Sequence, residues 1–175
     1  MLEKENIILR APEPEDVDFL YLMENDNRLW HLSGTLTPFS RFDLEQYVML
    51  PDKDIFATKQ ARFIIVKTEN GNKTIVGTVD LFDFEPQHQR AGVGIMVLEE
   101  FRSKGIAGTA LDVVIDYAFN LLGLHQLYCN IEEDNTASLK LFQNKGFEIS
   151  GIKKEWNKRG ANRIDEYMLQ LINKQ

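Results

Sequence analysis

The segment from residue 102 to residue 108 constrains the fold of this chain more than any other stretch. It follows an apolar run, residues 91–98, and it opens a helical pattern that continues to residue 122. A strand that enters a helix through a short glycine-containing loop leaves backbone N–H groups unpaired at the positive end of the helix dipole. Such a loop can bind phosphate. The segment reads Arg102, Ser103, Lys104, Gly105, Ile106, Ala107 and Gly108.

Two common nucleotide-binding loops are excluded at this segment. No Gly-Lys-Ser/Thr follows it, as a Walker loop requires, and it lacks the G-x-G-x-x-G pattern of dinucleotide-binding proteins. Gly105 and Gly108 allow close approach of the backbone to a ligand, and Arg102 and Lys104 add positive charge. An ordinary strand-to-helix turn would look much the same, so the segment alone leaves both interpretations open.

A second informative segment, residues 135–147, lies one predicted strand further along the chain. Asn135 is a good N-cap, and Gly146 is a typical residue at a helix end. Leu139, Leu141 and Phe142 lie on the predicted buried side of this helix. Taken alone, the segment predicts a capped amphipathic helix.

Hydrophobic periodicity predicts the order of the remaining elements. Residues 69–72 read as a hairpin turn inside a three-strand meander, and residues 27–40 show no clear period. The predicted helices are 14–25, 42–50, 106–122 and 135–145. The predicted strands are 7–11, 62–67, 73–82, 88–97, 126–131, 147–152 and 163–171.

Both segments resemble motifs of one protein family, the GNAT acyl-CoA N-acyltransferases. Residues 102–107 read as Arg-x-x-Gly-x-Ala, which is similar to the family's pyrophosphate motif, Gln/Arg-x-x-Gly-x-Gly/Ala. Residues 135–147 are similar to its Asn-x-x-(Ser/Ala)-x-x-Leu-(Tyr/Phe)-x-x-x-Gly-Phe. The two motifs occur in the family's order, separated by a helix and a strand. The resemblance spans nearly the whole chain, and it extends to bacterial spermidine N-acetyltransferases and ribosomal-protein N-acetyltransferases.

The resemblance implies a fold and an assembly. It implies one α/β N-acetyltransferase domain over residues 1–175. The expected architecture is a GNAT-type mixed, mainly antiparallel sheet of six to seven strands, sandwiched between helices in an α-β-α arrangement. Acetyl-CoA is the implied cosubstrate, and a homodimer is the implied assembly.

The resemblance also implies which residues hold acetyl-CoA. Residues 95–97 would pair with the pantetheine arm as an extra strand, and a backbone N–H near Met96 and Val97 would polarise the thioester carbonyl. Asn135 would hydrogen-bond the arm, with Ser138 close to it. A primary amine would attack directly, without a covalent acyl-enzyme. The implied cofactor-binding residues are Ile95, Met96, Val97, Arg102, Ser103, Lys104, Gly105, Ile106, Ala107, Gly108, Asn135 and Ser138.

The sequence departs from the family pattern at the groups that transfer protons. Many relatives carry Tyr at the position of Phe142, where the hydroxyl protonates the departing thiolate, and Phe cannot do this. Some relatives carry Glu on the strand before the phosphate loop, whereas residues 91–97 contain no carboxylate. Glu132, Asp80 and Asp83 are the remaining candidates for a general base, although a solvated turn is the default interpretation of Glu132.

The charge distribution bears on the partner. Residues 1–60 hold 12 Asp and Glu against 6 Lys and Arg, whereas residues 101–175 hold 9 against 10. With a net charge of −7, a nucleic-acid partner is disfavoured. The acidic N-terminal third favours a cationic acceptor, although a merely solvated acidic surface explains it about as well.

Composition bounds the class of protein. The single cysteine, Cys129, excludes an internal disulfide framework and a multi-cysteine metal site, and we expect it to be a small buried apolar residue. The N-terminal residues are charged and do not read as a signal peptide, and no apolar run approaches the ~20 residues that span a bilayer. We therefore expect a cytoplasmic protein that needs neither a membrane nor a metal.

Three functions remain open at this point. The first is acetyl-CoA-dependent acetylation of a small amine or polyamine such as spermidine. The second is the same chemistry on a protein N-terminus, such as that of a ribosomal protein. The third is a non-catalytic acyl-CoA-binding module, which Phe142 favours.

Overall fold

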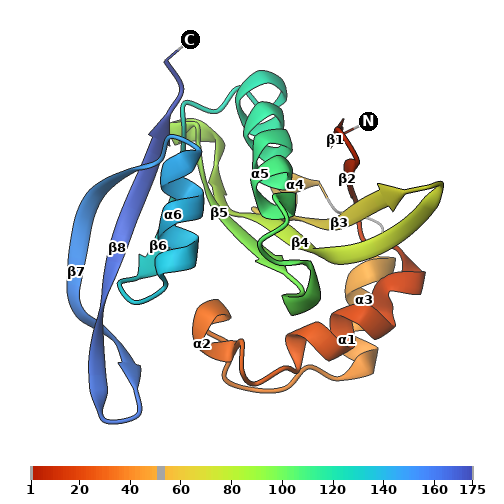
Figure 1. Ribbon diagram of the computed structural model, residues 1–175, viewed down its shortest axis with the longest axis horizontal. Coiled ribbons are helices and arrows are strands. Elements are labelled where there is room, and N and C mark those ends of the chain that lie inside the picture. Colours follow the sequence, from red (N-terminus) through yellow and green to blue (C-terminus); the bar gives the residue numbers. More distant parts are fainter. Residues whose placement is uncertain (1, 51–53, 175) are drawn as a thin grey trace. The chain divides into compact units, whose positions relative to one another are not determined.

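The computed structural model describes residues 2–50 and 54–174 (Figure 1). The chain divides into two compact units. One comprises Met1–Arg10 and Asp54–Gln175, and the other comprises Ala11–Lys53. The larger unit contains the whole sheet and both segments that the sequence singled out.

Within the described residues, the sheet has eight strands in the order β1-β2-β3-β4-β5-β6-β8-β7. Every neighbouring pair is antiparallel except β5 and β6, which are parallel. The expected mixed, mainly antiparallel GNAT-type sheet is therefore confirmed, with one strand more than the six to seven expected. The strands are β1 Leu2–Lys4, β2 Ile7–Arg10, β3 Ala61–Glu69, β4 Asn72–Glu85, β5 Arg90–Val97, β6 Gln126–Glu132, β7 Glu148–Arg159 and β8 Asn162–Ile172.

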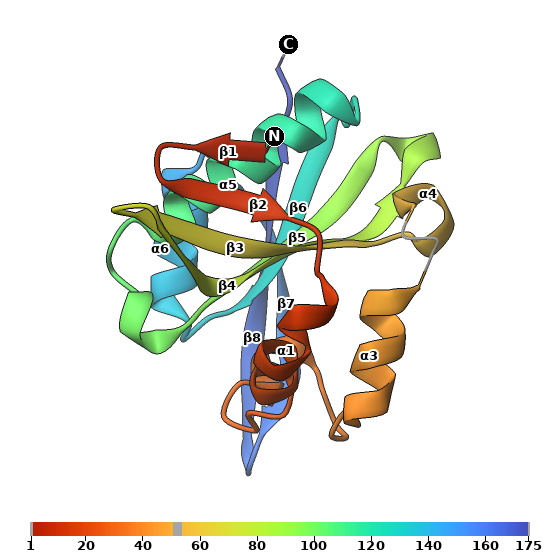
Figure 2. The ribbon, with the colours of Figure 1, turned by 90° about the vertical axis from the view of Figure 1, so that its right-hand side faces the viewer.

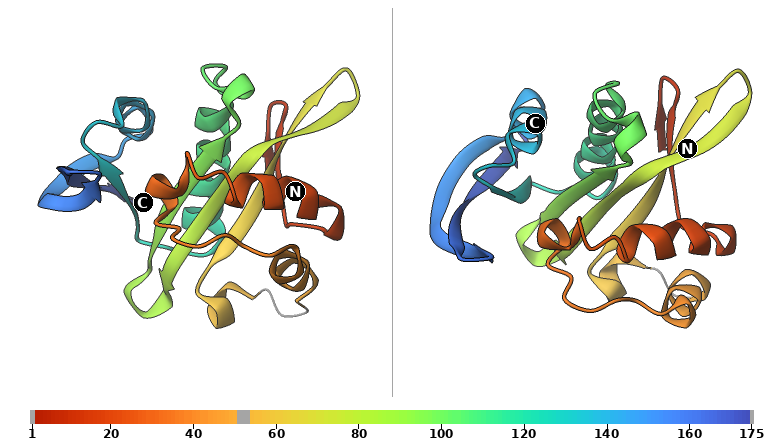
Figure 3. Two further views of the ribbon diagram at one scale, coloured as in Figure 1. Left: turned by 90° about the horizontal axis from the view of Figure 1, so that it is seen from below. Right: turned by 60° about the horizontal axis from the view of Figure 1, so that its bottom comes forward.

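The additional strand is β1, which pairs with β2 in a short hairpin beside α5 (Figure 2). It is three residues long and two of them are charged, so it has no hydrophobic alternation to reveal it. The last hairpin is also longer than the sequence predicts. Bulges interrupt its register between Ile149 and Gly151 and between Lys153 and Asn157, which breaks the period of two that marks a strand. β7 and β8 curve together as one arm (Figure 3).

The helices of the larger unit follow the sequence closely. α5 spans Ile106–Asp116 and continues as a π-helical turn over Tyr117–Leu121, which matches the predicted helix 106–122. α6 spans Thr136–Asn144. The sequence did not predict three short elements, each of three or four residues, because so few residues cannot show a hydrophobic period. They are the helix α4, Ile55–Thr58, and the 3₁₀ turns η2, Pro86–His88, and η3, Glu99–Phe101.

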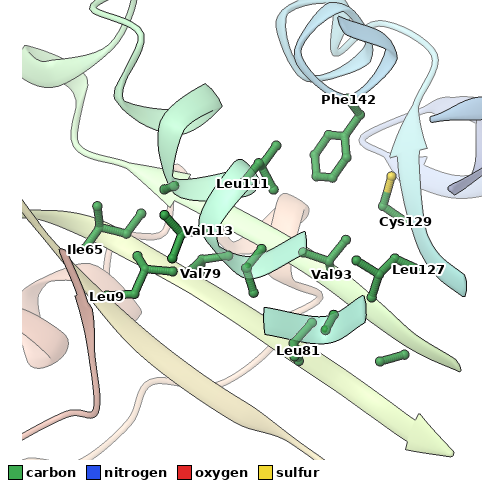
Figure 4. Packing of buried hydrophobic residues seen from close by; sticks show 14 of the residues in the cluster. Leu9, Ile65, Val79, Leu81, Val93, Leu111, Val113, Leu127, Cys129 and Phe142 are labelled. Atoms are coloured by element: carbon green, nitrogen blue, oxygen red, sulfur yellow. The ribbon is translucent and has the colours of Figure 1, made fainter. Parts of the chain in front are cut away.

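The core of this unit lies between α5 and one face of the sheet (Figure 4). α5 contacts β1, β2, β4 and β5. Successive strand residues point to opposite faces, so every second residue of each central strand enters this core. Its members include Val79 and Leu81 of β4, Ala91, Val93 and Val97 of β5, Leu127 and Cys129 of β6, and Leu111 and Val114 of α5.

The smaller unit is helical. The predicted helix 14–25 begins as a 3₁₀ turn, η1, Pro14–Asp16, and continues as α1, Val17–Glu24. The predicted helix 42–50 is α3, Arg41–Met49, which begins at a capping box made by Ser40 and Asp43. Between them lies a short helix, α2, Trp30–Ser33, in the stretch without a period. Among the described residues, no helix is long and apolar enough to cross a membrane.

Candidate active site

The parallel ladder between β5 and β6 is short, and it leaves a gap in the sheet (Figure 1). The two strands pair at Arg90–Gln126, Ala91–Leu127 and Gly92–Tyr128, and no further pair follows among the described residues. β5 nevertheless continues to Val97, where it pairs with β4. Residues 93–97 therefore have a strand on one side and, on the other, the opening that we call the gap.

The register of β4 and β5 decides which backbone groups face the gap. The N–H of Leu98 donates to the carbonyl of Val76 at 2.9 Å. Opposite residues in an antiparallel ladder alternate between pairs that exchange hydrogen bonds and pairs that do not. Val97, opposite Gly77, belongs to the second kind, so its N–H and C=O point away from β4 and toward the gap. Met96 belongs to the first kind, so β4 uses its N–H.

The same alternation turns the backbone groups of Ile95 and Val93 toward the gap. The side chain of Arg102 agrees with this assignment, because its Nε donates to the carbonyl of Val97 at 2.9 Å. An extended ligand in the gap would thus find a strand edge to pair with. The backbone donor expected near Met96 and Val97 stays a prediction, and of these two residues Val97 is the one whose N–H faces the gap.

The loop that we expect to bind phosphate lies between the end of β5 and the start of α5. Ser103 and Gly105 both adopt left-handed backbone conformations, with φ of 59° and 78°. Gly105 is the N-cap of α5, and no side chain caps the helix there. The first helical hydrogen bond runs from the N–H of Thr109 to the carbonyl of Gly105 at 3.0 Å. The N–H groups of residues 106–108 therefore have no acceptor within the helix, and their binding of a phosphate stays a prediction.

The two cations of this segment also have local roles. Arg102 braces the end of β5 through Val97, and Lys104 Nζ donates to the carbonyl of Glu100 at 2.7 Å. Lys104 Nζ also lies 5.6 Å from the centre of the Phe101 ring. Both charges remain within the loop that would hold the phosphate, so their predicted electrostatic contribution fits their position.

The second motif forms the capped helix that the sequence predicts. The N–H of Ser138 donates to Asn135 Oδ1 at 3.2 Å, so Asn135 is the N-cap of α6. Its predicted hydrogen bond to the cofactor, with Ser138 nearby, stays a prediction, and the amide Nδ2 is the group that would donate it.

Phe142 is buried in the core, with 2% of its surface exposed. Its ring packs edge-to-face on Phe147 at 5.1 Å, and the thiol of Cys129 points toward it (Figure 4). Burial raises the pKa of Cys129 to about 12, so the thiol stays protonated. The prediction of a small buried apolar residue is confirmed for Cys129, and Phe142 offers no proton to a leaving group.

The carboxylate candidates lie in three different environments. Glu132, with 8% of its side chain exposed, forms an ion pair with Arg159, which argues against the predicted base role. Asp80 forms an ion pair with Arg62 at 2.7 Å. Asp83 accepts a hydrogen bond from the Tyr128 hydroxyl at 3.0 Å. The sequence did not single out Tyr128, because a tyrosine in a strand is ordinary and its partner is 45 residues away.

No group of three His, Cys, Asp or Glu side chains that could hold a metal ion occurs in residues 2–50 and 54–174.

Comparison with known proteins gives a consistent result. The chain is 28% identical over 175 residues to the "Uncharacterized N-acetyltransferase p20" of Bacillus licheniformis, covering 99% of this chain and 97% of that protein. It is 29% identical over 149 residues to the spermidine N(1)-acetyltransferase of Vibrio cholerae, covering 83% of this chain and 80% of that protein.

The fold is similar to a crystal structure of spermidine N-acetyltransferase from Vibrio cholerae in complex with CoA and spermine. The TM-score is 0.84 at 24% identity, and the match covers 97% of this chain and 96% of that one. The family profile described as "Acetyltransferase (GNAT) domain" matches residues 6–148. Since that match takes in well over half of the chain, the protein belongs to the GNAT acetyltransferase family.

Proposed function

We propose that this protein is an acetyl-CoA-dependent N-acetyltransferase that transfers an acetyl group to a primary amine of a small amine or polyamine. The observation that carries the proposal is the gap. A strand edge with inward-facing N–H and C=O groups leads from residue 93 to Val97 and on to the uncapped start of α5. This is the arrangement that an extended arm ending in a pyrophosphate needs.

The chain's own residues would divide the work as follows. Val93 and Ile95 would pair with the arm, and residues 103–108 would bind the pyrophosphate. The N–H of Val97 would donate to an oxygen on which negative charge develops. Acetyl-CoA, when bound, supplies an activated thioester. Phe142 cannot protonate the leaving thiolate, so the thiolate would depart as an anion stabilised by nearby N–H groups.

Membership of the family and the name of one relative support the choice of acceptor. The Vibrio cholerae protein is named as acting on spermidine, a cationic polyamine. The acidic N-terminal third of this chain suits such an acceptor. One competing function has a specific observation in its favour, because Phe142 in place of Tyr would suit an acyl-CoA-binding module without turnover.

A screen for released CoA thiol separates these functions. Purified protein is incubated with acetyl-CoA and spermidine, spermine, simple diamines, monoamines and N-terminal peptides. We expect thiol release with polyamines above release with peptides. If none of the tested acceptors causes release of CoA thiol, while acetyl-CoA still raises the melting temperature, the result would instead support the binding module.

Assembly and location complete the proposal. A homodimer was expected from the resemblance, whereas one solved structure of the Vibrio cholerae enzyme is described as dodecameric. Sedimentation at micromolar concentration tests whether this chain forms a dimer, a larger assembly or a monomer. A cytoplasmic location stays a prediction, which cell fractionation tests.

A further inference from the structure

The strands beside the gap have a second face, opposite the α5 core, where three aligned residues mark the closed end of the gap. Phe82 of β4 is opposite Gly92 of β5, and Gly92 is opposite Tyr128 of β6. Directly opposite residues carry their side chains on the same face. The rings of Phe82 and Tyr128 accordingly meet edge-on, with their centres 5.9 Å apart.

β5 presents little side-chain bulk on this face. A Cβ atom on Gly92 would lie 2.2 Å from the Phe82 ring, so the ring rests directly on the strand. Two residues on, a Cβ atom on Gly94 would have only one described heavy atom within 4 Å, again from Phe82. Gly92 and Gly94 thus add no side chain to this face of β5, although Arg90 and Met96 flank them on the same face.

The hydroxyl of Tyr128 is fixed at this place by Asp83. Asp83 lies at the bulge between Phe82 and Glu85, with a left-handed φ of 47°, and its Oδ2 accepts the Tyr128 O–H at 3.0 Å. An extra residue at a bulge re-aims a side chain, and here it aims a carboxylate at the tyrosine. The phenol oxygen keeps its lone pairs for another donor.

The titration of Tyr128 is consistent with this geometry. Burial, followed by the hydrogen bond to Asp83 and the negative charge there, raises the pKa of Tyr128 to about 12. The phenol therefore stays neutral at ordinary pH. It then donates its O–H to Asp83, and its oxygen accepts a hydrogen bond from a cation.

The side chain of Phe142, at the position where relatives carry the acid, lies on the α5 side of the sheet. Phe142 belongs to the same core cluster as Val93, Leu127 and α5. The rings of Tyr128 and Phe82, by contrast, lie on the opposite face. An acceptor that approaches from this opposite face would reach the closed end of the gap without displacing an arm that lies along β5.

We propose that Tyr128, braced by Asp83, binds the acceptor amine at the closed end of the gap, on the face opposite α5. The ammonium N–H donates to the phenol oxygen, and the carboxylate behind it stabilises the cation. The acceptor class is a primary ammonium on an unbranched chain, because Gly92 and Gly94 add no side chain beside the phenol and the Phe82 ring lies against them. This inference rests on the proposed function.

The test uses the full chain and three substitutions. Tyr128→Phe keeps the ring against Phe82 and removes only the oxygen. Since a hydrogen bond to a charged group contributes ~1.5–3 kcal/mol, we expect the KM for spermidine to rise about ten- to a hundredfold. The KM for acetyl-CoA and the melting temperature should stay close to those of the wild type. Asp83→Asn should raise the spermidine KM less, and should weaken its dependence on ionic strength.

Asp116→Asn is the matched control. Asp116 is a carboxylate on α5, outside the proposed site, that accepts a hydrogen bond from the Asn120 amide at 2.7 Å. The control should leave both KM values unchanged. A rise of less than twofold in the spermidine KM of Tyr128→Phe, or an equal rise in both KM values, would overturn the proposal.

A binding measurement keeps this inference separate from the proposed function. If the wild type acetylates no amine, spermidine is titrated against the protein saturated with CoA, and the melting temperature is followed. A shift that Tyr128→Phe abolishes and Asp116→Asn keeps would support the amine site without turnover. No shift in the wild type, or an unchanged shift in Tyr128→Phe, would refute it.

Discussion

A Cβ atom on Gly77 would lie 2.0 Å from the carbonyl oxygen of Met96, so β4 and β5 meet at this point more closely than any side chain permits. The next nearest atom, Cα of Val97, would be 2.9 Å away, and it too belongs to the backbone. Neither atom can rotate aside. The close approach fixes the part of β5 whose N–H faces the gap.

Gly77→Ala should therefore affect both stability and ligand binding. Forcing extra volume between two backbones costs about 1–3 kcal/mol, which a urea titration would detect. We also expect weaker binding of acetyl-CoA, because β5 must move at Val97. Gly151→Ala in β7 is the control, since its Cβ would meet nothing within 4 Å. Equal effects of the two substitutions would contradict this account.

The phosphate seat can be tested with two glycines in the same conformation. Gly105 has φ +78° and Gly160 has φ +62°, and a Cβ on either would meet nothing within 4 Å. Valine strains the backbone at both positions, by roughly 1–3 kcal/mol. We expect Gly105→Val to abolish the rise in melting temperature with acetyl-CoA and Gly160→Val to retain it. If Gly105→Val keeps the full rise, the pyrophosphate binds elsewhere.

Phe142→Tyr tests the missing acid. General-acid assistance is typically worth ~10²–10⁴-fold, so a hydroxyl that reaches the leaving group should raise kcat. The position is 2% exposed, and a hydroxyl left without a partner there would lower stability by about 1–3 kcal/mol. We expect a higher kcat with little loss of melting temperature. An unchanged kcat with intact acetyl-CoA binding would mean that another group already supplies the proton.

Asp112 of α5 gives a prediction about pH. Its two oxygens pair with Lys4 of β1 at 2.8 Å and with Lys145, which follows α6, at 2.6 Å. Burial acts to raise the pKa of Asp112, but the hydrogen bonds from Lys145 and Lys4 outweigh it, so the net pKa is below its ordinary value. A group with a depressed folded-state pKa stabilises the fold above its unfolded pKa, and this stabilisation is lost as pH falls through the folded pKa.

Asp112→Asn should accordingly lower the free energy of unfolding at neutral pH, by about 0.5–1 kcal/mol for pairs that are partly exposed. The difference from the wild type should shrink once the pH falls below the ordinary pKa of aspartate. Thermal unfolding at a series of pH values checks this. A difference that is constant from neutral to strongly acidic pH would rule out the ion pairs as its cause.

Local sequence signals predicted the parts of the site that are themselves local. The loop 102–108, the N-cap Asn135 and the helix after it depend on residues a few positions apart, so turn and capping chemistry reveals them. The contact of Tyr128 with Asp83 joins two strands across 45 residues and depends on a bulge. Alternation assigns each residue a face, but it does not say which residue of another strand will lie opposite.

The same limit explains why the residues themselves did not predict the gap. The sequence predicted that residues 95–97 would border a break in the sheet only through resemblance to a family. Nothing in residues 90–97 or 126–132 states that their ladder ends after Gly92 and Tyr128. That end follows from where the two strands are held by their other neighbours, β4 and β8, which lie far away in the sequence.

The short ladder between β5 and β6 has a consequence for the exchange of backbone amide hydrogens. The sheet consists of two groups of strands, β1 to β5 on one side of this ladder and β6, β8 and β7 on the other. Within the described part of the chain, three residue pairs join the two groups. A ligand that pairs along Ile95 would supply β5 with hydrogen bonds where β6 makes none. Amide hydrogen exchange at Val93, Ile95 and Val97 should then be fast in the free protein and slow with acetyl-CoA, while exchange at the three joined pairs changes little.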